Sequence, residues 1–97
     1  MKLYMETKLP VVILKERKKY VAYTPALDIS TCGNTLTQVK KRFGEMVNIF
    51  IKEAINMGTL EEILLECGWE KITRPKPHWT PPHIITRHQQ KITLPVG

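Results

Sequence analysis

Three histidines in the last third of the chain are the first residues whose type suggests chemistry. They are spaced by five residues, at His78, His83 and His88. Along an extended chain the first and third share one face and the second takes the other, so they do not converge. The two cysteines, Cys32 and Cys67, are distant in sequence and lack metal-type spacing. We therefore predict exposed loop histidines, reduced thiols and no metal site.

Acidic residues offer little for acid–base catalysis. Asp28 is the only aspartate, and the glutamates fall mostly on predicted helix surfaces. Neither a glycine-rich phosphate loop nor a Gly-x-Ser-x-Gly motif is present. A catalytic histidine would need a nearby partner acid or base, and the tail that carries the histidines holds no carboxylate side chain. The sequence predicts no catalytic residue, no cofactor and no enzyme.

Charge and aromatic residues instead indicate binding. The net charge of +6 is concentrated in residues 71–97, which hold five Lys/Arg and no acid. Such a tail suits RNA or an acidic protein surface, or it is simply solvated. Aromatic side chains can stack on RNA bases while neighbouring basic side chains contact the phosphates. The candidate RNA-contact residues are therefore Tyr20, Arg74, Lys76, Trp79 and Arg87. The alternative is that Trp69 closes the core and Trp79 attaches the tail to it.

Three short strands and two helices must position these residues. Strand patterns cover residues 9–15, 20–24 and 29–32, with a possible extension at residues 2–6. An apolar stripe and a Thr35–Gln38 capping box predict a helix from Thr35 to Gly58. A second capping box, Thr59–Glu62, opens a shorter helix that ends at Gly68. The corner before the long helix, at Gly33, Asn34 and Thr35, is interpreted as structural, with glycine permitting a tight or positive-φ turn.

Three isoleucines of the long helix lie outside its main apolar row. They are Ile49, Ile51 and Ile55. One small sheet cannot cover them, so either the second helix or another subunit does. Because each buried aliphatic side chain is worth about 1.5–3 kcal/mol, we favour a homo-oligomer, either a dimer or a tetramer.

The chain changes character after residue 73. Five of the seven prolines lie beyond this point, and they favour an extended path. The stretch 91–96 then alternates, with Ile92, Leu94 and Val96 on one face. We expect a terminal strand that adds to a sheet edge in its own subunit or a neighbour's. The expected division is a domain over residues 1–73 and a proline-rich basic arm over residues 74–97.

Residues 9–57 resemble the HicB antitoxin family. The resemblance is carried by a strand with a Tyr-x-Ala-x-x-Pro pattern, then a Gly-Asn-Thr corner, then a helix; the matching residues are Tyr20, Ala22, Pro25, Gly33, Asn34, Thr35 and Leu36. It implies a β-β-β-α unit similar to a partial RNase H fold without catalytic carboxylates. The chain departs from the family pattern at residues 27–30 and 38–39. No helical DNA-binding pattern follows Gly68, so direct DNA binding is not expected.

Together these features predict an α+β fold, with a small antiparallel three-stranded sheet packed on a long helix, a second short helix and an arm ending in a strand. The resemblance implies a HicB-like antitoxin that binds a small HicA-type RNA-cleaving toxin. The alternatives are an RNA-binding module acting through the arm and a stand-alone oligomeric scaffold. No signal-peptide core or membrane-spanning run is present, so we expect a cytoplasmic protein.

Overall fold

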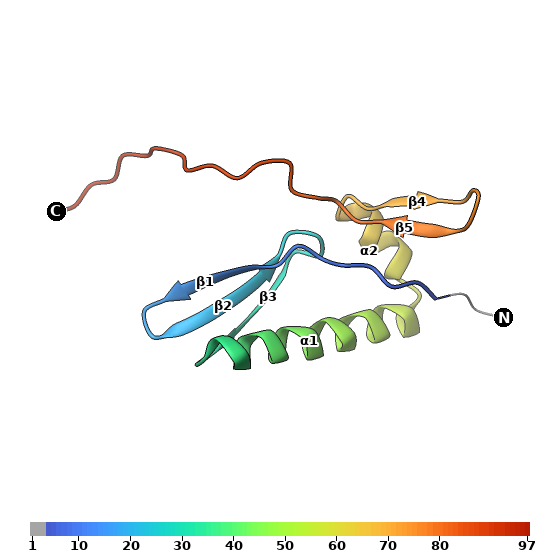
Figure 1. The fold of residues 1–97 in the computed structure, drawn as a ribbon, viewed down its shortest axis with the longest axis horizontal. Helices are drawn as coiled ribbons and strands as arrows, with labels where there is room; N and C mark the ends of the chain where they lie inside the picture. Colours follow the sequence, from blue (N-terminus) through green and yellow to red (C-terminus); the bar gives the residue numbers. More distant parts are fainter. Residues whose placement is uncertain (1–3) are drawn as a thin grey trace.

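A three-stranded antiparallel sheet rests on one long helix and is followed by a helix–hairpin unit and an extended arm (Figure 1). The computed structural model describes residues 4–97. Its elements are β1 (Val12–Glu16), β2 (Lys19–Thr24), β3 (Ile29–Gly33), α1 (Leu36–Met57), α2 (Leu60–Glu66), β4 (Glu70–Ile72) and β5 (His78–Thr80). The predicted α+β class, the three-stranded sheet on a long helix and the second short helix are confirmed.

The sheet has the order β1-β2-β3, and its register sets which side chains face α1. Val21 pairs with Leu14 and Cys32, while Ala22 pairs with Ile13 and Thr31. Ala22 and Thr24 are completely buried, whereas Val21 and Tyr23 on the opposite face are only half-buried. Alternate side chains of β2 therefore lie on opposite faces of the sheet, as expected for the strand predicted over residues 20–24. Thr24 satisfies its buried hydroxyl by accepting the Ala26 N–H at 3.2 Å.

Two small apolar clusters hold the elements together. The first joins Ala22 to Val39 and Phe43, between the sheet and the start of α1. The second places Ala26, Leu27, Leu64 and Trp69 between the sheet, α1 and α2. The Trp69 indole N–H donates to the Ala26 carbonyl at 2.7 Å. The expectation that this tryptophan closes the core is confirmed.

The corner before α1 depends on close approach rather than on an unusual backbone angle. Gly33 is not among the residues with positive φ, contrary to one of the two readings of the corner. A β-carbon at Gly33 would lie 2.9 Å from the Val39 backbone nitrogen. Thr35 caps the helix by accepting the Gln38 N–H at 3.0 Å, as predicted. The return bond differs, because the Gln38 Oε1 accepts from Asn34 N–H rather than from the cap residue itself.

The junction between the helices only partly follows the prediction. Gly58 ends α1 in the left-handed region, at φ 71°, as expected. Thr59, however, makes no side-chain capping bond to α2. Its N–H and hydroxyl both donate to the Ala54 carbonyl, at 2.9 and 3.5 Å. The second capping box is thus wrong, because Thr59 is held by the orphan carbonyl at the end of α1.

The proline-rich stretch folds differently from the prediction. Residues 70–72 and 78–80 form a hairpin, β4–β5, that joins residues on both sides of the expected boundary at 73/74. Pro75 and Pro77 lie in its turn, where no ladder hydrogen bond is lost. Beyond Pro82 the chain is exposed and has no helix or strand through Gly97. The predicted terminal strand over 91–96 is therefore wrong for the single chain: the segment is extended but has no ladder partner.

The N-terminal part is also less regular than predicted. The first strand begins at Val12 rather than Leu9. Of the possible extension over residues 2–6, residues 2 and 3 lie outside the described part, and residues 4–6 form no strand. The charged turn after β1 is tight, since Glu16 pairs directly with Lys19. Arg17 adopts a left-handed φ of 54° there.

Candidate protein-binding surface

The face of the sheet that points away from α1 carries no helix or other strand of residues 4–97. The register places on it the side chains of Val12, Leu14, Glu16, Lys19, Val21, Tyr23, Ser30 and Cys32. We call this set the outer sheet face. Leu14, near its centre, is 53% exposed. Figure 1 shows α1 against the opposite face, while the arm passes on the outer side.

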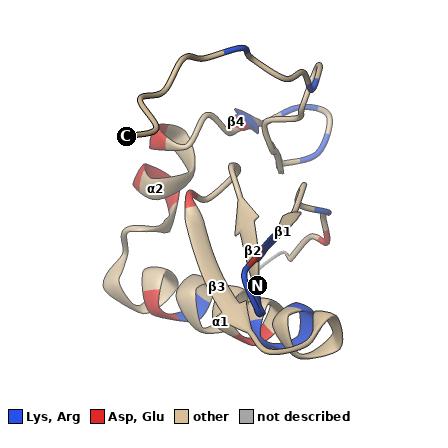
Figure 2. Ribbon diagram, turned by 90° about the vertical axis from the view of Figure 1, so that its left-hand side faces the viewer, with Lys and Arg blue, Asp and Glu red and all other residues tan. Residues whose placement is uncertain are grey.

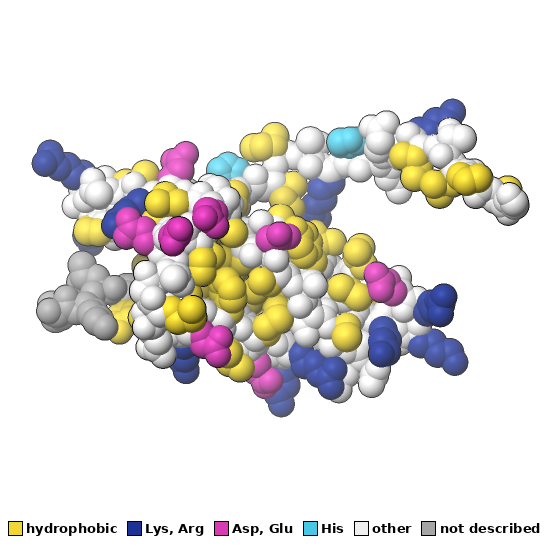
Figure 3. All heavy atoms as spheres, turned by 180° about the vertical axis from the view of Figure 1, so that it is seen from behind, with side chains coloured by type: hydrophobic (Ala, Val, Ile, Leu, Met, Phe, Trp, Pro, Cys, Tyr) yellow, Lys and Arg dark blue, Asp and Glu magenta, His cyan; other side chains and the backbone are white. Residues whose placement is uncertain are grey.

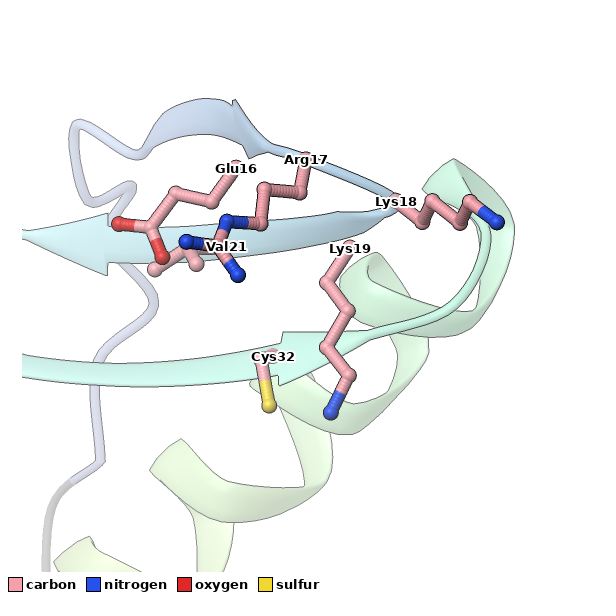
Figure 4. A pocket seen from close by; sticks show the side chains of 6 residues that line it. All are labelled: Glu16, Arg17, Lys18, Lys19, Val21 and Cys32. Carbon is pink, nitrogen blue, oxygen red and sulfur yellow. The ribbon is translucent and has the colours of Figure 1, made fainter.

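A shallow hollow lies at the turn end of this face (Figure 4). Val21 and Cys32 form its apolar floor, and the charged residues 16–19 form its rim. Its volume is about 820 Å³, and it opens broadly to solvent. An apolar floor with a charged rim resembles the centre and edge of protein interfaces. Since Glu16 is the one carboxylate lining it, the hollow is better suited to binding a partner side chain than to acid–base chemistry.

The edges of the sheet differ from each other. β1 and β3 are the two edge strands. On β3 the Arg42 guanidinium donates to the Cys32 carbonyl at 3.1 Å, which ties this edge to α1. An edge strand presents unpaired backbone groups on which another strand can add. Because β3 already has this side-chain partner, β1 is the better edge for such an addition.

The three isoleucines predicted as an oligomer interface do not form one surface. Ile51 packs against the cluster beneath α2, so the second helix covers it. Ile49 and Ile55 are 58% and 46% exposed. They are six residues apart and therefore point to different sides of α1. The second helix thus covers one of the three, and the role of Ile49 and Ile55 in an oligomer interface stays a prediction. Ile92, Leu94 and Val96 on the arm, from the same predicted interface, are all exposed.

The candidate RNA-contact residues are also not brought together. Tyr20 is half-buried beside α1, with the Lys15 Nζ 5.6 Å from its ring centre. Trp79 packs on the core cluster of Trp69, and the Lys71 Nζ lies 5.7 Å from its ring. The expectation that Trp79 attaches the tail to the core is confirmed. Arg74 and Lys76 lie in the β4–β5 turn, which Figure 1 shows at the far side of the molecule from the β1–β2 turn, and Arg87 lies on the arm.

A small polar cluster at the other end of the outer sheet face was missed from the sequence. The Tyr23 hydroxyl donates to the Asp28 Oδ1 at 3.0 Å. This bond raises the pKa of Tyr23 above its ordinary value of 10.0. Burial, followed by the charges of Asp28 and Glu66, raises the pKa of the nearby Cys67 thiol. The pairing arises because Asp28 takes a left-handed φ of 54°, which alternation patterns do not reveal.

Residues 4–97 contain neither a group of side chains suited to a metal ion nor a membrane-spanning helix. Within residues 4–97, no three His, Cys, Asp or Glu side chains gather into a group that could hold a metal ion. In the same range, neither helix is long and apolar enough to cross a membrane. Both cysteines are free thiols, with Cys32 exposed and Cys67 half-buried.

Comparisons of the chain with models of protein families, with curated proteins and with solved structures give no match. The resemblance to HicB antitoxins therefore rests on the residues of the corner and of β2.

Proposed function

We propose that this protein is a HicB-like antitoxin, or a descendant of one, that binds and neutralises a small HicA-type RNA-cleaving toxin in the cytoplasm. The observation that carries the proposal is the outer sheet face, a surface of Val12, Leu14, Val21 and Tyr23 that no element of the described chain covers. Leu14 at its centre is exposed and the other three side chains are half-buried, and uncovered apolar surface of this kind marks interaction sites.

Neutralisation requires only that the partner's active surface be covered. The sheet would form the rigid part of the interface with the toxin, because Val39 and Phe43 of α1 pack against its other face. The arm supplies a flexible part, because residues 83–97 are exposed throughout and include Arg87 and Lys91. A rigid centre with an extended arm can surround a small protein of about the same size.

The test is neutralisation of the toxin encoded beside this chain. The tagged protein is purified from its own host, co-eluting proteins are identified by mass spectrometry, and the recovered toxin is assayed for RNA cleavage. We expect a small protein in stoichiometric amount whose activity falls to zero as this chain is added. Recovery of this chain alone, together with an adjacent toxin that it neither binds nor inhibits, would remove the proposal.

Exposed apolar residues on the arm favour a second candidate, a stand-alone oligomer. Ile92, Leu94 and Val96 are all largely exposed in the single chain, and β1 offers an edge in a second copy. Exchange of arms would close a two-fold dimer, since each copy both gives and receives a strand. Deleting residues 83–97 should then convert a dimer to a monomer in light scattering, with unchanged circular dichroism. An unchanged oligomeric state would count against arm exchange.

A further inference from the structure

Seven basic side chains from two distant segments meet at one end of the molecule. They are Lys15, Arg17, Lys18 and Lys19 around the β1–β2 turn, and Lys40, Lys41 and Arg42 in the second turn of α1. We call this set the basic end. Only Glu16 and Glu45 lie among these residues. In Figure 2 the blue hairpin tip reaches down to the first turns of α1.

The sheet register explains why the two segments are neighbours. Lys15 pairs with Tyr20, which pairs in turn with Gly33. Gly33 lies against Val39, the residue before the basic stretch of α1. Arg42 is fixed to β3 by its bond to the Cys32 carbonyl. The packed core of the sheet–helix unit thus fixes the positions of these positive charges.

Most carboxylates of the folded body lie away from the basic end. Glu61, Glu62, Glu66 and Glu70 lie on α2 and β4, away from the β1–β2 turn. Figure 3 shows Lys and Arg gathered at the lower right and acidic side chains on the α2 side. The first turn of α1 also holds no acidic residue to offset its positive end. The positive charges of the basic end repel one another unless an anionic partner neutralises them.

We infer that the basic end binds the phosphate backbone of a nucleic acid, independently of any toxin partner. Several exposed Lys and Arg side chains held at fixed positions suit regularly spaced phosphates, which are recognised without base readout. Tyr20, from the candidate RNA-contact set, lies within this end beside Lys15. The site is therefore on the folded body, whereas the sequence alone placed RNA contacts mainly on the arm.

The test compares two variants with the same loss of charge. The body variant carries Lys18→Gln, Lys19→Gln, Lys40→Gln and Lys41→Gln, all at exposed positions whose side chains form no hydrogen bond or ion pair within the described residues. The matched variant, called the arm variant, carries Arg74→Gln and Lys76→Gln in the β4–β5 turn and Arg87→Gln and Lys91→Gln on the arm, also at exposed positions. Full-length proteins are titrated by fluorescence anisotropy against labelled 20-mers of single-stranded RNA, duplex RNA and duplex DNA over a range of salt. Circular dichroism checks that both variants are folded.

We expect the wild type to bind at least one of these oligonucleotides, and the preferred one identifies the form that is recognised. Each lost phosphate contact lowers the slope of log affinity against log salt by about 1, so the body variant should lose about 3–4 in slope and at least about tenfold in affinity. The arm variant should change much less. No binding at low salt, or a larger loss in the arm variant, would overturn the inference. Equal competition by polyglutamate would also overturn it, because it would indicate an acidic protein partner.

Discussion

Gly33 lies directly against the backbone of Val39, so that a β-carbon on Gly33 would be 2.9 Å from the Val39 nitrogen and 3.0 Å from its Cα. This approach seats α1 on the sheet and sets the spacing between the outer sheet face and the helix behind it. It also brings the basic segments of the β1–β2 turn and α1 together. The absence of a side chain at Gly33 therefore supports both the outer sheet face and the basic end.

The first prediction concerns this contact. Gly33→Ala forces backbone atoms of α1 to shift, and we expect a loss of about 1–3 kcal/mol in the free energy of unfolding. Gly44→Ala is the matched control, because a β-carbon there meets nothing within 4 Å. In mid-helix this change should stabilise by about 0.5–1 kcal/mol. Urea denaturation followed by circular dichroism measures both, and equal effects of the two substitutions would refute the contact.

The second prediction concerns the indole of Trp69. Trp69→Phe removes the donor to the buried Ala26 carbonyl and leaves that oxygen without its partner. We expect a destabilisation of about 1–3 kcal/mol from the unsatisfied group. Trp79→Phe, at a half-buried position, should destabilise less. A greater loss of stability from Trp79→Phe in the same denaturation assay would show that Trp69 does not close the core.

The third prediction follows from the pair of Tyr23 and Asp28. The hydrogen bond to the Asp28 carboxylate raises the pKa of Tyr23 above 10.0, so the neutral phenol is favoured in the folded state. The resulting stabilisation is fully present below the unfolded pKa, near 10, and is lost as the pH rises through the higher folded pKa. Absorbance titration near 295 nm should show one late-ionising tyrosine. Asp28→Asn should lower its pKa, and an unchanged titration would exclude the pair.

The fourth prediction distinguishes the two thiols. Cys32 is exposed on the outer sheet face, whereas burial raises the pKa of Cys67. Since the thiolate is the reactive form, Cys67 should react more slowly with a disulfide reagent at pH 8. Cys32→Ser should remove the fast phase, and Cys67→Ser the slow one. Loss of the slow phase in Cys32→Ser would reverse the assignment.

The sequence predicted most reliably what local patterns determine. The strand predicted over residues 20–24 has alternate side chains on its two faces, as observed in β2. The Thr35 cap and the glycine at Gly58 correctly predicted the two ends of α1. Thr59 had the same local pattern as Thr35 but failed as a cap, because the end of α1 competes for its donors. The pairing of β4 with β5 depends on two short segments finding each other across a proline-rich turn, which no periodicity encodes.

The candidate surfaces were harder to predict because they depend on register. The sequence placed Ile49, Ile51 and Ile55 together, but α2 covers only one of them. The proximity of residues 40–42 to residues 15–19 appears only when β1, β2 and β3 are paired. The outer sheet face likewise becomes recognisable only once α1 is known to occupy the other side.

The central claim is that the outer sheet face binds a protein partner, and one pair of substitutions tests it most directly. Leu14→Glu places a charge at the exposed centre of that face, while Ile49→Glu makes the same kind of change on an exposed side of α1. Both proteins are titrated into an RNA-cleavage assay of the toxin encoded beside this chain. We predict that Leu14→Glu abolishes inhibition and that Ile49→Glu inhibits as well as the wild type. Full inhibition by a folded Leu14→Glu protein would contradict the assignment of this face.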